Sequence, residues 1–372
     1  MTVSPSSVAG NTTALGYKSG LDGLRAIAVT LVIASHLGIR GAEGGTIGVH
    51  IFFVLSGFLI TSLLLQEAAR YGNISLGTFY ARRALRLLPA MLIVVIATDA
   101  YMAFDSGNPV RSDTIEATPS VLFYYANWWW FAHGDRAALG WFGHMWSLAV
   151  EEQFYLVWPL FLILVIRGRW SMRRLVEVLL LTCVVSLSLR TWAVANLAGG
   201  FFGTPMVAEM LMYGVIAALF LRAARPAVAL WAARLQWLAV AYLGLYLTIV
   251  PTGLYNNTIG SGPALSGVAI STAVVILHVT TNQVALLPRI LAWSPLVFLG
   301  RISFGMYLWH ILICYSLSEW IDFTHHLRPL YWVTGYGLTV LVALISQRYV
   351  EAPVLRLKDS PRLRRAPGTP TR

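Results

Sequence analysis

Charged residues are scarce in this chain. They make up 12% of its 372 residues, against about a quarter in an average soluble domain, while hydrophobic residues make up 57%. So few charges exclude an ordinary water-soluble fold. Several apolar runs reach the roughly 20 residues that an α-helix needs to cross a bilayer. We therefore predict an all-α membrane protein, a polytopic bundle of about ten transmembrane helices.

Lysine and cysteine are scarce as well. Lys18 and Lys358 are the only lysines, so arginine carries almost all of the positive charge behind the net charge of +11. The arginines lie in short loops between apolar runs and near the C-terminus, where positive charge sets membrane orientation, so the charge indicates topology and no nucleic-acid partner. Cys183 and Cys314 lie within apolar runs, and we expect neither a disulfide nor a metal site.

The apolar runs predict ten spans within one membrane domain, residues 21–353. The inner loops are rich in arginine and the outer loops are poor in it, which places both termini in the cytoplasm. We expect residues 1–20 to form a disordered cytoplasmic tail, because they lack a signal-peptide pattern, and residues 354–372 to form a basic one. The expected spans are 21–39, 47–66, 87–104, 145–166, 174–195, 204–223, 232–250, 262–281, 296–317 and 329–350.

One outer connection, residues 105–144, is long. Its apolar part, residues 120–132, is too short to span the bilayer and predicts an interfacial or re-entrant segment. The tandem tryptophans 128–130 fit an aromatic belt at the membrane surface, and they also fit a platform on which a sugar stacks.

The first polar motif is a pair of ionisable residues in the first span, Arg25 and His36. Eleven residues are close to three helical turns, so both side chains lie within roughly 20° of one face and their Cα atoms about 16 Å apart along the axis. Asp22, one turn from Arg25, can hold its guanidinium. Taken singly, Arg25 is also explained as a boundary charge and His36 as a hydrogen-bonded interior histidine. Together they predict the two ends of a channel for a long ligand, with His36 as a general base.

Arg83 and Arg86 form the second motif, at the cytoplasmic start of the third span. They lie three residues apart and therefore on one helical face. Guanidinium groups bind phosphates through paired hydrogen bonds, so the motif predicts a phosphate site. The alternative for either arginine is ordinary topology signalling.

Adjacent carboxylates at the start of an apolar run, Glu151 and Glu152, form the third motif. Glu151 shares a helical face with Tyr155, whereas Glu152 points about 100° away. A carboxylate here can orient His36 or bind an acceptor sugar. For Glu152 alone, a surface position is an equal alternative.

A fourth motif consists of Ser303, Tyr307 and His310. Their spacing of i, i+4 and i+7 places them on one stripe of a helix and predicts a second polar seam facing the bundle interior. For His310, a catalytic role and that of a satisfied buried histidine both fit the pattern.

These motifs, in this order, resemble the integral-membrane acyltransferase-3 family over residues 21–353. The resemblance rests on four stretches: Arg25 with His36 (Arg/Lys-x10-His), residues 52–59 (the second-span signature), Arg83 with Arg86 (Arg-x-x-Arg) and residues 146–155 (Trp-Ser-Leu…Glu…Phe-Tyr). Residues 303–310 and 351–353 also look similar to the family.

The resemblance implies a bacterial cell-membrane enzyme that transfers an acyl group, often acetyl, from cytoplasmic acyl-CoA to a hydroxyl of a sugar. Family acceptors include envelope polysaccharides, lipid-linked glycans and glycosylated antibiotics such as macrolides. It implies His36 as the catalytic histidine, acting as general base or as acyl carrier, and Arg25, Arg83 and Arg86 near the CoA phosphates. We also expect Glu151 to assist catalysis, and the following residues to contact substrate: Glu152, Tyr155, Ser303, Tyr307 and His310.

Many larger relatives in the family carry an extra soluble hydrolase-like domain, and this sequence ends at Arg372 without one. We therefore expect the membrane bundle to complete the transfer alone or with a separate partner. Two other functions fit a polar-lined bundle, a transporter or flippase for a lipid-linked or glycosylated compound and a non-catalytic partner of a synthase. A transporter predicts paired discontinuous helices and pseudo-symmetric halves, which the sequence does not suggest. A non-catalytic partner leaves the spacing of Arg25 and His36 unexplained.

Overall fold

The computed structural model describes residues 16–134, 136–197, 203–223, 226–249, 261–320 and 328–356, and this part of the chain contains helices but no β-strand. The predicted all-α class is therefore confirmed. Nine helices in these ranges are long and apolar enough to cross a membrane. The protein is a multi-pass membrane protein, as its composition predicts.

Each of the ten predicted spans corresponds to a helix. They are α1 (Ser19–His36), α2 (Ile47–Tyr71), α3 (Leu76–Phe104), α6 (Met145–Arg167), α7 (Met172–Asn196), α8 (Thr204–Arg222), α9 (Pro226–Ile249), α11 (Pro263–Thr281), α13 (Ser294–Trp320) and α14 (Arg328–Ser346). Only α1 is missing from the set of nine, because it has just 18 residues and several of them are polar. The shorter elements are η1 (Glu43–Thr46), α4 (Arg111–Leu122), α5 (Ala126–His133), η2 (Arg136–Phe142), α12 (Leu286–Leu291), η5 (Gln347–Glu351) and α15 (Ala352–Arg356).

The boundaries differ from the prediction most clearly at α3, which begins at Leu76 and not at residue 87. Arg83 and Arg86 therefore lie on the helix and not in a loop before it. A span predicted from hydropathy ends where charged residues begin. The helix itself can continue, because alanine, leucine and arginine all favour helix. The predicted tails lie mostly outside the described residues, although α1 already begins at Ser19 and α15 extends to Arg356.

The long outer connection folds into α4, α5 and η2, and not into one apolar segment. The predicted segment 120–132 is interrupted at Tyr124, whose φ of 55° separates α4 from α5. The Trp129 indole donates to a backbone carbonyl of η2 at 2.9 Å, and Trp130 packs edge-on against a tryptophan of α6. These two rings hold the connection together, while Trp128 remains 40% exposed.

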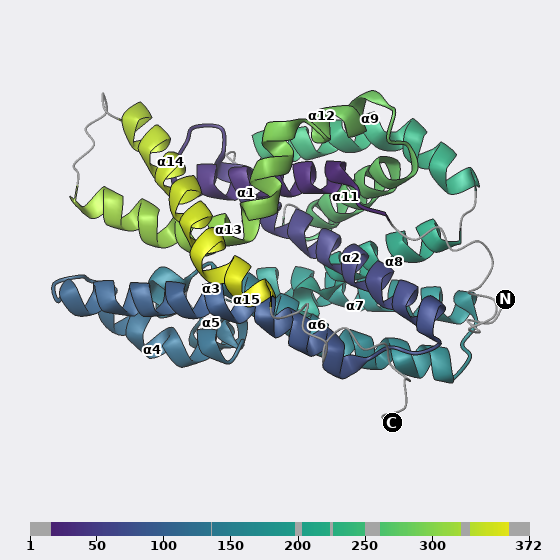
Figure 1. Ribbon diagram of the computed structural model, residues 1–372, viewed down its shortest axis with the longest axis horizontal. Coiled ribbons are helices and arrows are strands. Elements are labelled where there is room, and N and C mark those ends of the chain that lie inside the picture. The colour runs from purple at the N-terminus through teal and green to yellow at the C-terminus, as the bar shows by residue number, and fades with distance from the viewer. Residues whose placement is uncertain are drawn as a thin grey trace.

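Helix α1 packs between α13 and α2, and α2 also packs against α8 (Figure 1). Helix α14 crosses the bundle, and the elements that follow it, η5 and α15, contact α3 (Figure 1). This arrangement brings α1, α2, α3, α6 and α13 to a common interior region. All the polar motifs singled out between residues 25 and 310 lie on these helices.

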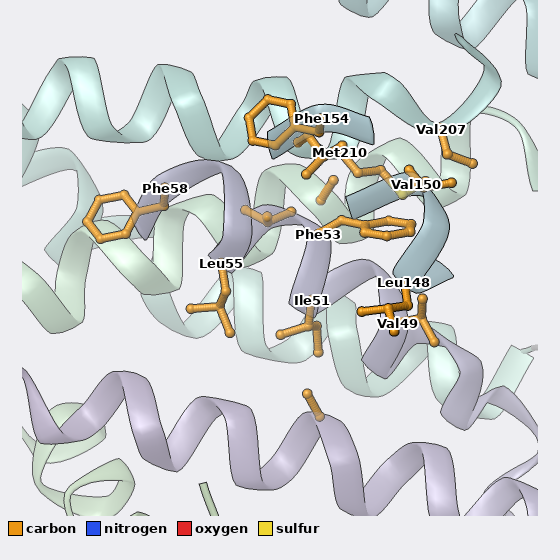
Figure 2. Close-up of a cluster of buried hydrophobic side chains, with 14 of the residues drawn as sticks. Val49, Ile51, Phe53, Leu55, Phe58, Leu148, Val150, Phe154, Val207 and Met210 are labelled. Carbon is orange, nitrogen blue, oxygen red and sulfur yellow. The ribbon is translucent and has the colours of Figure 1, made fainter. Parts of the chain in front are cut away.

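Large apolar side chains fill the space between α2, α6 and α8. Phe53 and Phe58 of α2 are fully buried; Phe53 lies near Met210 of α8 (Figure 2) and packs edge-on against Trp146 of α6 with ring centroids 5.8 Å apart. Close packing of this kind fixes the rotation of α2 and α6 about their axes. The polar side chains on the other faces of these two helices are thereby held in place.

Glycines bring α2 and α8 into backbone contact. A Cβ atom at Gly57 would fall on the carbonyl oxygen of Leu211, and a Cβ atom at Gly214 would fall on the carbonyl oxygen of Val54. Lipid supplies no hydrophobic force between transmembrane helices, so their association depends on such close approach. The pair of glycines therefore determines the distance between α2 and α8.

Replacing Gly57 with alanine is expected to lower the free energy of unfolding by about 1–3 kcal/mol, because the new methyl group pushes α2 away from α8. The measurement is unfolding of the purified protein in mixed detergent micelles. Gly337→Ala in α14 is the matched control, since no atom lies within 4 Å of its new Cβ. Equal losses of stability in the two variants would contradict the role of Gly57.

Candidate functional site

Arg25 and His36 face the same neighbouring helix, α13. The Arg25 Nε–H donates to Ser303 Oγ at 3.2 Å, and the His36 ring meets the His310 ring edge-on with a centroid separation of 4.9 Å. The predicted shared face of α1 is therefore confirmed. The stripe on α13 also points inward as predicted, because Ser303 and His310 both contact α1.

Three guanidinium groups, those of Arg25, Arg83 and Arg86, form what we call the arginine group. Arg83 donates from Nε and Nη2 to Glu152 Oε1 at 3.2 and 3.1 Å, and its guanidinium carbon lies 3.0 Å from the centroid of the Tyr155 ring. Arg86 lies one helical turn from Arg83 and within electrostatic range of both Arg25 and Arg83. Like charges at this range repel one another, so the arrangement favours an anionic ligand.

The two adjacent carboxylates lie beside the arginine group. Glu151 accepts hydrogen bonds from Ser56 Oγ at 2.8 Å and from the Tyr155 hydroxyl at 3.3 Å. It is within electrostatic range of the arginine group, and Glu152 pairs directly with one of its members. The predicted common face of Glu151 and Tyr155 is confirmed. These contacts place Glu151 with the arginines, whereas the sequence analysis linked it to His36.

Three imidazoles, those of His36, His310 and His144, form what we call the histidine group. His310 lies between the other two, with ring centroids 4.9 Å from His36 and 5.0 Å from His144. Nδ1 of His36 lies 2.9 Å from a carbonyl oxygen of α1, and Nδ1 of His310 and Nε2 of His144 lie 2.6 and 3.2 Å from carbonyl oxygens of α13. A carbonyl oxygen only accepts, so these nitrogens carry the hydrogen in the neutral rings. The nitrogen of His36 that can take up a proton is therefore Nε2.

Tyr307 and Phe52 connect the histidine group to its surroundings. The Tyr307 hydroxyl donates to the backbone carbonyl of His144 at 2.8 Å, and the Ser147 hydroxyl lies 2.6 Å from the same phenol oxygen. The Phe52 ring lies 6.3 Å from the Tyr307 ring and 5.8 Å from the guanidinium carbon of Arg25. Phe52 thus lies between the arginine group and the histidine group, and the two groups form one site.

The sequence analysis missed His144 and Ser56 as members of this site. Ser56 lies within the 52–59 signature, so that motif contained its signal, whereas His144 stands two residues before the motif of residues 146–155. Neither residue has a periodic partner on its own helix, which is why spacing did not reveal them. Within the described ranges, no three His, Cys, Asp or Glu side chains are arranged to hold a metal ion.

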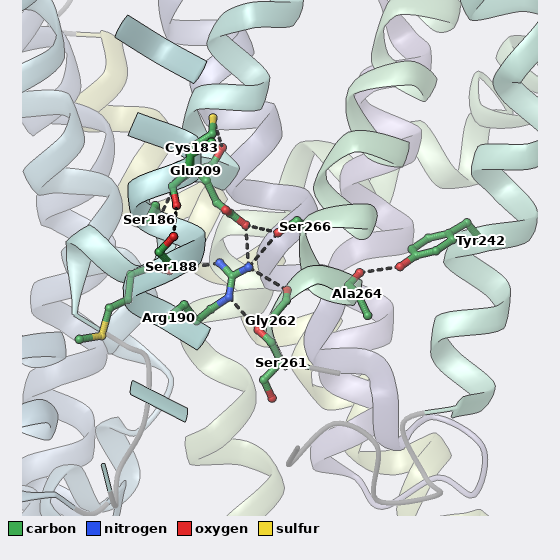
Figure 3. Close-up of polar contacts among 12 residues, drawn as sticks. Cys183, Ser186, Ser188, Arg190, Glu209, Tyr242, Ser261, Gly262, Ala264 and Ser266 are labelled. Carbon is green, nitrogen blue, oxygen red and sulfur yellow. Dashed lines mark hydrogen bonds and ion pairs between the residues drawn. The ribbon is translucent and has the colours of Figure 1, made fainter. Parts of the chain in front are cut away.

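A second polar cluster, also missed, lies away from this site between α7, α8 and α11. Arg190 and Glu209 are fully buried and form an ion pair with Nη2 2.7 Å from Oε1. The same guanidinium donates to Ser266 Oγ at 2.9 Å and to the carbonyl oxygens of Ser261 and Gly262 at 2.7 and 2.9 Å (Figure 3). This cluster ties three helices together and takes no part in the candidate site.

Comparison with known proteins agrees with the resemblance that the motifs predict. The family model of the acyltransferase domain (Acyl_transf_3) matches residues 18–348. The chain is 32% identical over 361 residues to YrhL of Bacillus subtilis, 32% identical over 358 residues to the peptidoglycan O-acetyltransferase OatA of Listeria monocytogenes, and 30% identical over 358 residues to the O-acetyltransferase OatA of Staphylococcus aureus.

Each of these three matches covers 91% of this chain but only 55% to 57% of the relative, so the chain spans little more than half the length of these curated relatives. No solved structure matches the chain. The family model nevertheless extends from the residue before α1 to the π-helical turn after α14 and includes both the arginine group and the histidine group. The chain therefore belongs to the acyltransferase-3 family of membrane proteins.

Proposed function

We propose that the protein is a membrane-embedded O-acyltransferase, which moves an acetyl or another short acyl group from acyl-CoA to a hydroxyl of a carbohydrate-containing acceptor. One observation supports this function above all: Arg25 and His36 lie on one face of α1 and both contact α13. Their separation along the helix, about 16 Å, suits a ligand with phosphates at one end and a reactive thioester at the other.

The arginine group is the proposed binding site for the CoA phosphates. Guanidinium groups match phosphates with two parallel hydrogen bonds, and three of them are gathered here on α1 and α3. In this proposal Glu151 and Glu152 hold the guanidinium groups apart in the absence of donor, as the contact of Arg83 with Glu152 suggests. In this proposal Glu151 lies at the donor end of the site and supports catalysis indirectly, by holding the arginines that bind the donor.

His36 is the proposed catalytic residue. Its Nε2 takes the proton from the acceptor hydroxyl while the hydroxyl oxygen attacks the thioester carbonyl carbon. The carbon–sulfur bond then breaks, and the proton on Nε2 passes to the departing thiolate, so that atoms and charge balance. If His36 instead carries the acyl group as an intermediate, the same nitrogen forms the bond, because Nδ1 is held at a carbonyl oxygen of α1.

The acceptor is proposed to reach the histidine group from the side opposite to the arginines. All three of these relatives carry the name of an O-acetyltransferase, and the names of those from Bacillus subtilis and Listeria monocytogenes include peptidoglycan. A cell-envelope glycan is therefore the first acceptor to test, and a glycosylated metabolite such as a macrolide is the second. Ser303, Tyr307 and His310 are the proposed contacts on α13.

Replacing Arg83 with alanine is expected to weaken binding of acetyl-CoA about 10- to 100-fold, the value of one lost hydrogen-bonded charge pair of about 1.5–3 kcal/mol. Binding of labelled acetyl-CoA to the purified protein in nanodiscs measures this. Arg82→Ala is the matched control, because Arg82 is the exposed neighbour of Arg83 on α3. Equal affinities of the Arg83→Ala and Arg82→Ala variants for acetyl-CoA would contradict the proposed donor site.

A further inference from the structure

We infer that His144 is a positioning residue for the proposed transfer, acting on His36 through His310. The inference rests on the proposed function and deepens it, since no motif of the sequence singled out this histidine. His144 lies at the start of α6, outside any regular helix, and is 5% exposed. A buried imidazole at such a position needs an explanation beyond packing, because burying a polar ring has a cost.

Both the ring and the backbone of His144 are fixed to α13. Its Nε2–H donates to the carbonyl oxygen of Leu308 at 3.2 Å, and its own carbonyl oxygen accepts from the Tyr307 hydroxyl at 2.8 Å. The Ser147 hydroxyl adds a contact to the same carbonyl oxygen at 3.3 Å. Two anchoring points on one helix hold the ring at a defined angle.

The ring of His144, which is itself held in place, limits the positions that the His310 ring can occupy. The two rings meet at 74° with centroids 5.0 Å apart, and on its other side His310 meets His36 at 67° and 4.9 Å. His310 is fully buried, so its ring has no solvent space into which to turn. His310 is also held through Nδ1 by the carbonyl oxygen of Tyr307 at 2.6 Å, so the ring contact with His144 limits the remaining freedom of the ring that packs against His36.

The effect of His144 should be confined to the transfer step. Arg25 of the arginine group lies about 16 Å along α1 from His36, so binding of the donor phosphates should not depend on the histidine contacts. A displacement of about 1 Å at a reacting group lowers a rate by about 100-fold. His144 should thus affect kcat and leave the KM for the acyl donor nearly unchanged.

The test compares His144→Ala and His144→Gln with His278→Ala, which removes a buried histidine of α11 that is 1% exposed. His144→Ala is expected to lower kcat about 10- to 100-fold with the KM for acetyl-CoA within about twofold of the wild-type value. His144→Gln should recover part of kcat, because its amide can donate to the Leu308 carbonyl. His278→Ala should leave kcat within about twofold of wild type.

Three results would overturn the inference: an unchanged kcat in His144→Ala, a loss of kcat equal to that of His278→Ala, or a loss that tracks the melting temperature across the variants. A second readout needs no turnover. Diethyl pyrocarbonate acylates unprotonated imidazole nitrogen, and peptide mass spectrometry measures its rate at His36. A wild-type protein that transfers no acyl group would refute the proposed function and with it the role of His144 in transfer. The positioning of His36 by His144 would then be supported separately if His144→Ala changes the rate of acylation at His36 about threefold or more, and contradicted if it does not.

Discussion

His36→Ala is expected to lower acyl transfer by about 100- to 10,000-fold, because the substitution removes the only group in the proposed mechanism that takes up the hydroxyl proton. The measurement is transfer of labelled acetyl groups from acetyl-CoA to isolated cell-envelope glycans by membranes containing the protein. The loss should appear in kcat, since in the proposed mechanism the arginine group, which includes Arg25 near the other end of α1, binds the phosphates of the donor.

Donor binding provides the control for this variant. Labelled acetyl-CoA should bind to His36→Ala within about twofold of the wild-type affinity, which separates a lost catalytic group from a misfolded protein. A His36→Ala variant that binds donor and transfers acyl groups at the wild-type rate would remove His36 from the mechanism. The histidine group would then be a packing feature of the bundle.

Arg190→Leu is expected to lower the free energy of unfolding by about 3–5 kcal/mol, because it leaves the carboxylate of Glu209 buried without its partner. The guanidinium now meets one carboxylate, one hydroxyl and several carbonyl oxygens, and the pair has 0% side-chain exposure. Unfolding in mixed detergent micelles measures the loss. The double variant Arg190→Leu with Glu209→Leu should recover part of it, because no uncompensated charge remains.

An exposed ion pair gives the matched control for Arg190. Arg173 and Glu177 of α7 are paired at 2.8 Å, but their side chains are 89% and 59% exposed. Arg173→Leu should leave the free energy of unfolding nearly unchanged, since water replaces the partner. If Arg190→Leu proved as mild as Arg173→Leu, the buried cluster would not be what ties α7, α8 and α11 together.

Periodicity alone predicted a large part of the site. Arg25 and His36 share a face because eleven residues complete nearly three turns, and Ser303 and His310 share a stripe for the same reason. Both predictions depend only on the geometry of a single helix. The structure confirms them through the Arg25–Ser303 hydrogen bond and the contact of the two histidine rings.

Contacts between helices were not predictable in the same way. The pairing of Arg83 with Glu152 and the position of His310 between two other histidines depend on how three or more helices rotate and cross. Those angles follow from side-chain packing and from glycine contacts such as Gly57 with Leu211, and one sequence does not specify them. His144 was missed for a related reason. It precedes α6, so the spacing of residues along a helix does not apply to it.

The boundary of α3 shows a limit of hydropathy as a guide. The sequence analysis began the third span at residue 87 because arginines precede it, yet the helix begins at Leu76. A guanidinium that pairs with a carboxylate and lies over an aromatic ring, as that of Arg83 does, is compatible with a position inside the bundle. Paired arginines can therefore lie within a helix whose extent apolar character alone underestimates.

The central claim concerns the position of the donor, and a cryo-electron microscopy structure with a non-hydrolysable acetyl-CoA analogue tests it most directly. We predict density for the phosphates against Arg25, Arg83 and Arg86, with the acyl end beside Nε2 of His36. An analogue bound elsewhere, or one bound at the arginines with its acyl end directed away from α1, would contradict the account.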